Sequence, residues 1–113
     1  MARGIHMIQT GDGTYWFFIG DSLEDSIAHL HLMIHDGKAS ITHFYVDPKF
    51  RRRGYGSRLL RKAESFSRRK GAKTLEVWLP TRDSNTKRFY QNRGFKIRRV
   101  KGRRFPRAFK RVG

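Results

Sequence analysis

A loop rich in arginine and glycine between residues 46 and 57 has the composition of a phosphate-binding site. It begins Val46-Asp47-Pro48 and continues, just before a helical pattern, with Arg51, Arg52, Arg53, Gly54, Tyr55, Gly56 and Ser57. Glycine lets a ligand approach the backbone closely, and the unpaired first N–H groups of a helix attract phosphate. The loop is therefore a candidate pyrophosphate site; the alternative is a plain basic turn at a helix start.

A second pattern combines two adjacent aromatic residues with a later glycine and phenylalanine. Phe89-Tyr90 is followed, after three further residues, by Gly94-Phe95. From its helical spacing alone, Tyr90 is expected to be a core aromatic residue.

The elements that position these residues follow from hydrophobic periodicity and turn residues. We predict strands over residues 5–9, 15–19, 27–34, 39–46, 74–79, 95–100 and 105–112, and helices over 54–70 and 84–92. Gly11-Asp12-Gly13 predicts a hairpin turn, and Gly71 and Gly94 are typical of helix C-terminal ends. Strand, helix and strand in the middle predict a parallel pair with a right-handed crossover.

The stretch 27–34 fits two structures. Apolar residues alternate with His29, His31 and Met33, which predicts a strand. The same residues also fit a helix capped at Ser22. The strand is favoured because Asp36-Gly37 then forms a hairpin turn into the next strand.

With these elements in place, both patterns resemble the GCN5-related N-acetyltransferase (GNAT) family. The acyl-CoA signature of that family is Val-x-Pro-x-x-Arg/Gln-x-x-Gly-x-Gly/Ala, running from a strand into a helix. Val46, Pro48, Arg51, Gly54 and Gly56 match every fixed position. The family's aromatic-Tyr pair, followed by three residues and Gly-Phe, is matched by the segment from Phe89 to Phe95. The resemblance covers roughly residues 26–100 and implies a GNAT-like mixed α/β sheet, β-β-β-β-α-β-α-β-β.

The resemblance implies acetyl-CoA as the acetyl donor, with no metal. The pantetheine arm would pair with the backbone near Tyr45 and Val46, where strands 39–46 and 74–79 splay apart. A strand amide near Val46 would polarise the thioester carbonyl, and Tyr90 would reprotonate the departing thiolate. The pyrophosphate would lie on the loop residues Arg51, Arg52, Arg53, Gly54, Tyr55, Gly56 and Ser57.

The sequence departs from the family pattern in three places. Many members have a Glu or His base four or six residues before the valine, where this chain has Thr42 and Ser40. We expect His43 to point to the opposite face from Thr42, because side chains alternate along a strand. Asp83 replaces an asparagine that often touches the cofactor, and Asn85 is the expected substitute. The turn at residues 11–13 leaves no room for the two helices that usually shape the acceptor site.

Composition and charge limit the class of protein. The 113 residues predict one domain, 1–113, and 26 Lys and Arg against 9 Asp and Glu give a net charge of +17, which attracts polyanions. The absence of cysteine excludes disulfides and thiolate nucleophiles. No apolar run is long enough to span a membrane and the first residues show no secretory pattern, so we expect a soluble, cytoplasmic protein without a membrane partner.

Two groups of side chains have open interpretations. His29, His31 and His35 share a strand face, but no carboxylate or cysteine accompanies them, so we expect a solvated or acceptor-facing edge and no metal site. Residues 96–113 hold nine Lys or Arg and no acid, interleaved with aromatic residues. This tail is either a polyanion-binding surface or a solubilising surface around a hairpin.

The sequence therefore predicts an N-acetyltransferase that moves an acetyl group from acetyl-CoA to an amine of an anionic or anion-associated acceptor. Nucleic acid or an acidic protein is the expected partner. The competing hypothesis is a non-catalytic module of the same fold that binds nucleic acid or protein. The missing base and the missing helices favour the second hypothesis, and the intact loop favours the first.

Overall fold

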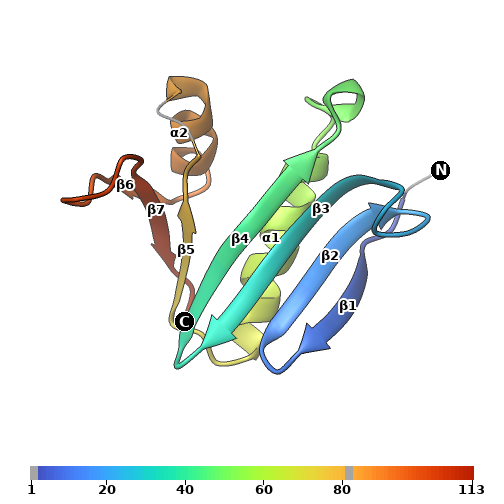
Figure 1. Ribbon diagram of the computed structural model, residues 1–113, viewed down its shortest axis with the longest axis horizontal. Coiled ribbons are helices and arrows are strands. Elements are labelled where there is room, and N and C mark those ends of the chain that lie inside the picture. The colour runs from blue at the N-terminus through green and yellow to red at the C-terminus, as the bar shows by residue number, and fades with distance from the viewer. Residues whose placement is uncertain (1–2, 81–82) are drawn as a thin grey trace.

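Seven strands form one mixed sheet in the order β1-β2-β3-β4-β5-β7-β6 (Figure 1). The computed structural model describes residues 3–80 and 83–113. Its strands are β1 (His6–Gly11), β2 (Thr14–Gly20), β3 (Ser26–His35), β4 (Lys38–Val46), β5 (Thr74–Trp78), β6 (Lys96–Arg98) and β7 (Arg107–Arg111). Its helices are the short 3₁₀ helix η1 (Pro48–Phe50), α1 (Tyr55–Arg69) and α2 (Ser84–Gln91). The predicted order of strands and helices is confirmed.

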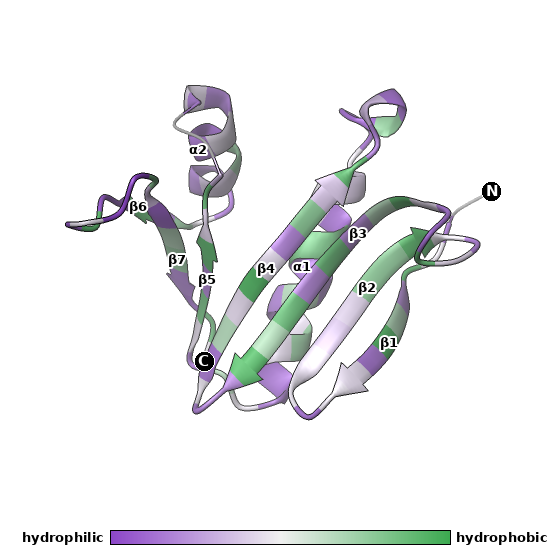
Figure 2. Ribbon diagram, in the orientation of Figure 1, coloured by the Kyte–Doolittle hydropathy of each residue, from purple (hydrophilic) through white to green (hydrophobic). Residues whose placement is uncertain are grey.

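The ambiguous stretch 27–34 is a strand. It lies within β3, and the turn at Asp36 and Gly37 leads directly into β4. Figure 2 shows the alternation of hydrophobic and hydrophilic residues along β3 that favoured this assignment. The last two predicted strands are shorter than expected: β6 ends at Arg98, and turns occupy much of the stretch before β7.

β4 and β5 pair only at their beginnings. They run parallel, as predicted, from Lys38 opposite Thr74 to Ile41 opposite Val77. Figure 1 shows the two strands diverging beyond that point. Over the described residues, β4 has no strand partner on its β5 side from Thr42 to Val46.

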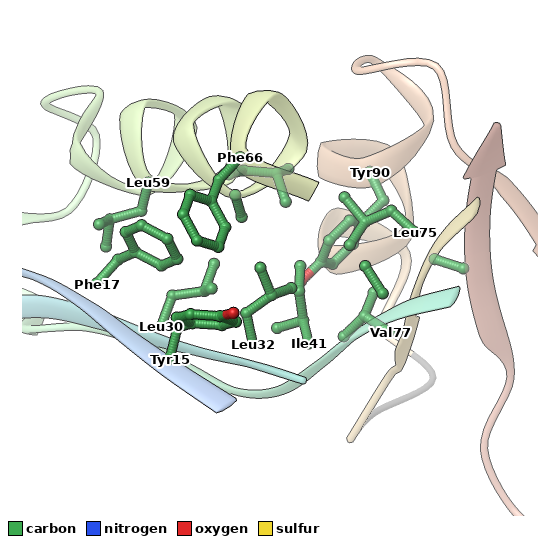
Figure 3. Close-up of a cluster of buried hydrophobic side chains, with 14 of the residues drawn as sticks. Tyr15, Phe17, Leu30, Leu32, Ile41, Leu59, Phe66, Leu75, Val77 and Tyr90 are labelled. Carbon is green, nitrogen blue, oxygen red and sulfur yellow. The ribbon is translucent and has the colours of Figure 1, made fainter. Parts of the chain in front are cut away.

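The core lies on one face of the sheet, under α1. Leu59, Leu60, Ala63 and Phe66 are the buried apolar side of this helix, and they pack against alternate residues of β2, β3 and β4 (Figure 3). Tyr15 and Phe17 meet Phe66 edge to face, with ring centroids 4.7 and 5.3 Å apart. Burial of these side chains fixes the helix against the sheet.

The opposite face of the sheet, here called the open face, carries no helix among the residues that the structure describes. In Figure 1, α1 lies behind β2, β3 and β4, and no element covers them in front. β1 and β2 are joined by a tight turn, as predicted, so no helix is inserted between them. Trp16, His29, His31 and Tyr45 lie on the open face.

One expectation for β4 is wrong: His43 and Thr42 point to the same face. The β3–β4 register shifts between His31 opposite His43 and Leu32 opposite Ile41, so Thr42 is an extra residue in β4. Such a bulge interrupts the alternation of side chains. Thr42 Oγ1 lies 2.5 Å from His31 Nδ1, and His43 Nε2 lies 3.0 Å from His29 Nε2, both on the open face.

Candidate functional site

A groove of about 680 Å³ lies between β4, the loop before α1, and α2. We call it the α1 groove. Most of the residues predicted to contact a cofactor line it, although they come from three separate parts of the chain. The predicted residues in its lining are Val46, Arg51, Arg52, Gly54, Tyr55, Gly56, Ser57, Asn85 and Tyr90.

The loop leaves the N-terminal amides of α1 without a cap. Gly54, the N-cap residue, is left-handed (φ 83°) and makes no side-chain capping bond. Arg52 is also left-handed (φ 61°), which is unusual for a residue with a side chain. By helix geometry, the first N–H groups of α1 have no carbonyl partner within the helix. This end of the groove can therefore receive an anion.

Gly56 forms the floor of the groove. A Cβ built on it would meet Val46 Cγ2 at 3.4 Å, Phe44 Cζ at 3.6 Å and Phe89 Cζ at 3.8 Å. Glycine here leaves room between the first turn of α1 and the apolar side chains of β4 and α2. A larger side chain would occupy that room.

Arg93 is a groove residue that the sequence analysis missed. Its Nε donates to Ser57 Oγ at 3.1 Å, its Nη2 also donates to Ser57 Oγ, and its Nη1 donates to Phe89 O at 2.7 Å. Its guanidinium lies 3.9 Å from the centre of the Phe89 ring. Arg93 thus brings a fixed positive charge to the N-terminus of α1. Its place between Tyr90 and Gly94 was visible, but nothing in the sequence showed that it would reach Ser57.

Tyr90 extends from α2 toward Ile41 of β4 (Figure 3). The residue is 5% exposed and lines the groove. Burial raises the pKa of its phenol above the usual value of about 10. The hydroxyl therefore keeps its proton at neutral and mildly alkaline pH, as a proton donor must.

Two predicted cofactor residues lie outside the groove. Arg53 places its guanidinium 5.5 Å from the centre of the Phe50 ring. Tyr45 turns its ring to the open face, 5.3 Å from the ring of His29. Only the backbone of Tyr45 is therefore at the unpaired edge of β4, and the carbonyl of Val46 beside it accepts a hydrogen bond from Arg51 Nε at 3.0 Å.

Asp83, which replaces the family's asparagine, caps a helix in this chain. Asp83 is the N-cap of α2, and its carboxylate accepts a hydrogen bond from Thr86 N at 3.3 Å. Asn85, the second residue of α2, lines the groove instead. The arrangement places an amide side chain at the groove, where we expected Asn85 to substitute for the family's asparagine.

A family model described as an acetyltransferase (GNAT) domain matches residues 12–97. The chain belongs to the GNAT acetyltransferase family. An uncharacterized N-acetyltransferase of Methanocaldococcus jannaschii is 34% identical over 62 residues, which is 55% of this chain and 27% of the relative. The chain thus spans about a quarter of the length of that relative.

Solved GNAT structures share the fold of this chain. A GNAT acetyltransferase from Staphylococcus aureus has a TM-score of 0.76 at 13% identity, covering 89% of this chain and 69% of that one. The PaiA N-acetyltransferase from Thermoplasma acidophilum, in complex with coenzyme A, has a TM-score of 0.75 at 22% identity, covering 88% and 61%. The ribosomal-protein-S18-alanine N-acetyltransferase from Escherichia coli has a TM-score of 0.72 at 19% identity, covering 92% and 72%.

A histidine cluster occupies the open face of this GNAT domain. His29 bonds to His43 and, through Nδ1, to Ser26 Oγ at 2.9 Å. The Trp16 ring lies within 5.7 Å of the ring centres of His29, His31 and His43. His35 stands apart, paired with Asp36 at 3.1 Å on the surface. Within residues 3–80 and 83–113, no group of three or more potential ligands has the geometry to hold a metal ion.

The histidine cluster predicts a loss of stability below neutral pH. Burial, and secondarily the charge of His43, lowers the pKa of His29 and His31. Below about pH 6.5 the unfolded chain therefore binds more protons than the folded one. The free energy of unfolding is then highest above about pH 6.5, and it decreases as the pH drops from there toward the pKa values of the folded state. We expect the melting temperature to fall between pH 7.5 and 5, and to fall less in the H29Q/H31Q variant. H35Q is the control, because its side chain is exposed; equal slopes in the three proteins would contradict the assignment.

No helix among the described residues is long and apolar enough to cross a membrane.

Proposed function

We propose that this domain transfers an acetyl group from acetyl-CoA to an amine on an anionic, or anion-bound, acceptor. The α1 groove carries the proposal, because it joins the uncapped N-terminus of α1 to the unpaired edge of β4 and to Tyr90. The groove suits a pyrophosphate: Arg51, Arg52 and Arg93 line it, and Gly56 keeps its floor open. The unpaired edge of β4 suits a pantetheine arm, which can pair with it like an added strand.

The chemistry supported by these residues is direct transfer. The amine nitrogen would attack the thioester carbonyl carbon while a β4 amide polarises the carbonyl oxygen. The C–S bond then breaks, and the Tyr90 hydroxyl would give its proton to the departing sulfur. With no cysteine in the chain, no thiol is present to form an acyl-enzyme.

The amine would lose its own proton to solvent. Ser40 Oγ donates to Glu76 Oε1 at 3.2 Å, and Thr42 Oγ1 is bonded to His31, so neither hydroxyl is poised as a base. The acceptor class follows from charge: a net charge of +17, concentrated in the second half of the chain, favours amines held close to phosphates or carboxylates.

Calorimetry of nuclease-treated protein with acetyl-CoA is the decisive test of this function. We expect saturable binding and a rise in melting temperature with acetyl-CoA concentration. Mass spectrometry with small amines should then detect an added acetyl group. Absence of acetyl-CoA binding would exclude the proposed function.

The dependence of rate on pH tests how the amine is deprotonated. With solvent as the proton acceptor, log(kcat/KM) should rise with unit slope up to the pKa of the amine. A second inflection in this profile that is absent from H43Q would instead assign the proton acceptor to His43. His43 is the residue to test because the β4 bulge puts it on the same face as Thr42, one of the positions where many family members have a base.

A non-catalytic binding module is the second candidate function. The engagement of Ser40 and Thr42 in other hydrogen bonds favours it. Acetyl-CoA binding without acetylation of any amine, including at alkaline pH, would support this second function over the first.

A further inference from the structure

The open face of the sheet displays large apolar side chains. Four of the five exposed large apolar side chains in the described residues lie on it: Ile8, Met33, Tyr45 and Trp78, each 38–43% exposed. Of these, Met33 and Trp78 line one hollow, and apolar side chains gathered on a surface are typical of binding sites. Trp16 and the histidine cluster add further rings to the same face.

The half of the open face on β5, β6 and β7 is strongly basic. Lys96 and Arg98 of β6 lie opposite Phe109 and Arg107 of β7, on the same side as Glu76 of β5. Glu76 accepts from Arg107 Nη1 at 2.9 Å and lies 3.5 Å from Lys38 Nζ, so its charge is balanced. Figure 2 shows the hydrophilic residues gathered along β6 and the loop before β7. This half of the face therefore has an excess of cations.

On this basic half, guanidinium groups lie over the exposed ring of Trp78 and the partly buried ring of Phe109. Arg103 lies 4.6 Å from the centre of the Trp78 ring, and Arg107 and Arg98 lie 4.8 and 5.4 Å from that of Phe109. Beside Trp78 is a hollow of about 510 Å³, whose walls include Met33, Thr42 and Ser40. This volume is in the range of pockets that hold small organic groups.

We propose that the open face binds single-stranded nucleic acid, with a base stacked at Trp78 and phosphates on Lys96, Arg98 and Arg103. Aromatic platforms beside cationic side chains bind single strands because every base has a ring face and every nucleotide a phosphate. A second copy of this chain is a poor occupant, since each copy carries +17. An acidic protein would use the cations but has no planar bases to fill the hollow at Trp78. Binding of nucleic acid to this face is separate from acetyl transfer and can be measured without acetyl-CoA.

The charge part of the proposal is tested with two matched triple variants. K96Q/R98Q/R103Q removes three cations from the open face, and R61Q/K62Q/R69Q removes three from α1, on the other side of the sheet. Nuclease-treated proteins are titrated into a labelled twelve-nucleotide U-rich RNA at several salt concentrations. We expect the first variant to flatten the slope of log K against log salt by about 2, at roughly 0.7 per phosphate contact, and the second to leave the slope near that of the parent. Equal losses in both would show general attraction by net charge and overturn the proposal.

The stacking part is tested with W78L, which keeps an apolar side chain but removes the ring. Trp78 is 38% exposed, so the fold should tolerate the change. We expect RNA binding to weaken about tenfold or more, while heparin, which has no bases, binds as before. Y15F, at a buried tyrosine on the helix side, is the control for a general effect of aromatic substitution.

Three results would overturn the assignment of the occupant. Unchanged RNA binding by W78L would remove the stacking platform. Polyglutamate binding that depends on Trp78 would indicate an acidic protein partner. Sedimentation as a dimer that W78L dissociates would assign the face to a second copy of the chain.

Discussion

Replacing Gly56 with leucine should remove binding of acetyl-CoA, while replacing it with alanine should leave a protein at least as stable as the parent. Gly56 is in the first turn of α1, and a Cβ there meets Val46, Phe44 and Phe89 at 3.4–3.8 Å. Alanine therefore just fits, whereas the further carbons of leucine must fill the groove. Loss of two charge-assisted hydrogen bonds to a pyrophosphate would weaken binding by about 100-fold or more.

The alanine variant separates stability from binding. The backbone at Gly56 is not left-handed, so alanine is not strained there. Replacing a helical glycine by alanine stabilises the folded protein by about 0.5–1 kcal/mol. For a domain of this size that is a rise in melting temperature of about 2–8 °C. G56A and G56L are compared by thermal melting and by calorimetry with acetyl-CoA. Full binding by a folded G56L would show that the ligand does not use the α1 groove.

Much of the fold could be predicted from local patterns. The helix over residues 54–70 has a single apolar side and glycines near both ends, and it is found at Tyr55–Arg69. The stretch 27–34 was ambiguous because its apolar residues fit both periods. The Asp36-Gly37 turn decided it correctly, because a hairpin places β3 and β4 side by side.

The groove was predicted in outline because its two halves each have a fixed spacing in the sequence. The loop before α1 and the Tyr90 segment, about thirty residues apart, meet across the first turn of α1. Arg93 was missed because its partner, Ser57, is distant in sequence and an arginine there has no signature. Long-range contacts of flexible side chains depend on packing, which periodicity does not encode.

The β4 bulge was also invisible in the sequence. Strict alternation predicts His43 and Thr42 on opposite faces of the sheet. Because Thr42 is an extra residue in β4, both side chains instead point to the same face. Neither Thr42 nor His43 marks such a site by its type. The bulge assembles the histidine cluster and stands where β4 loses β5 as a partner.

Replacing Tyr90 with phenylalanine should lower turnover by roughly 10²–10⁴-fold while leaving acetyl-CoA affinity nearly unchanged. The ring packs edge to face against Phe89 and Phe95, with centroids 5.2 and 5.4 Å away, and phenylalanine keeps both contacts. Only the hydroxyl is lost. Among the described residues that hydroxyl has no hydrogen-bond partner, so its removal should not unfold the domain.

The kinetic test of Tyr90 must isolate the chemical step. Single-turnover rates with saturating acetyl-CoA and a small amine exclude product release from the comparison. Y15F is the matched control, since it removes a hydroxyl from a residue equally buried, at 5% exposure, on the side of the core under Phe66 (Figure 3). Burial raises the pKa of Tyr90, so the phenol keeps its proton up to about pH 10. At any pH below that value, the rate of the parent should therefore show no decrease from loss of the phenolic proton. A single-turnover rate of Y90F equal to that of Y15F would mean that the thiolate leaves without a proton from this residue, and that Tyr90 serves only to pack α2 against the sheet.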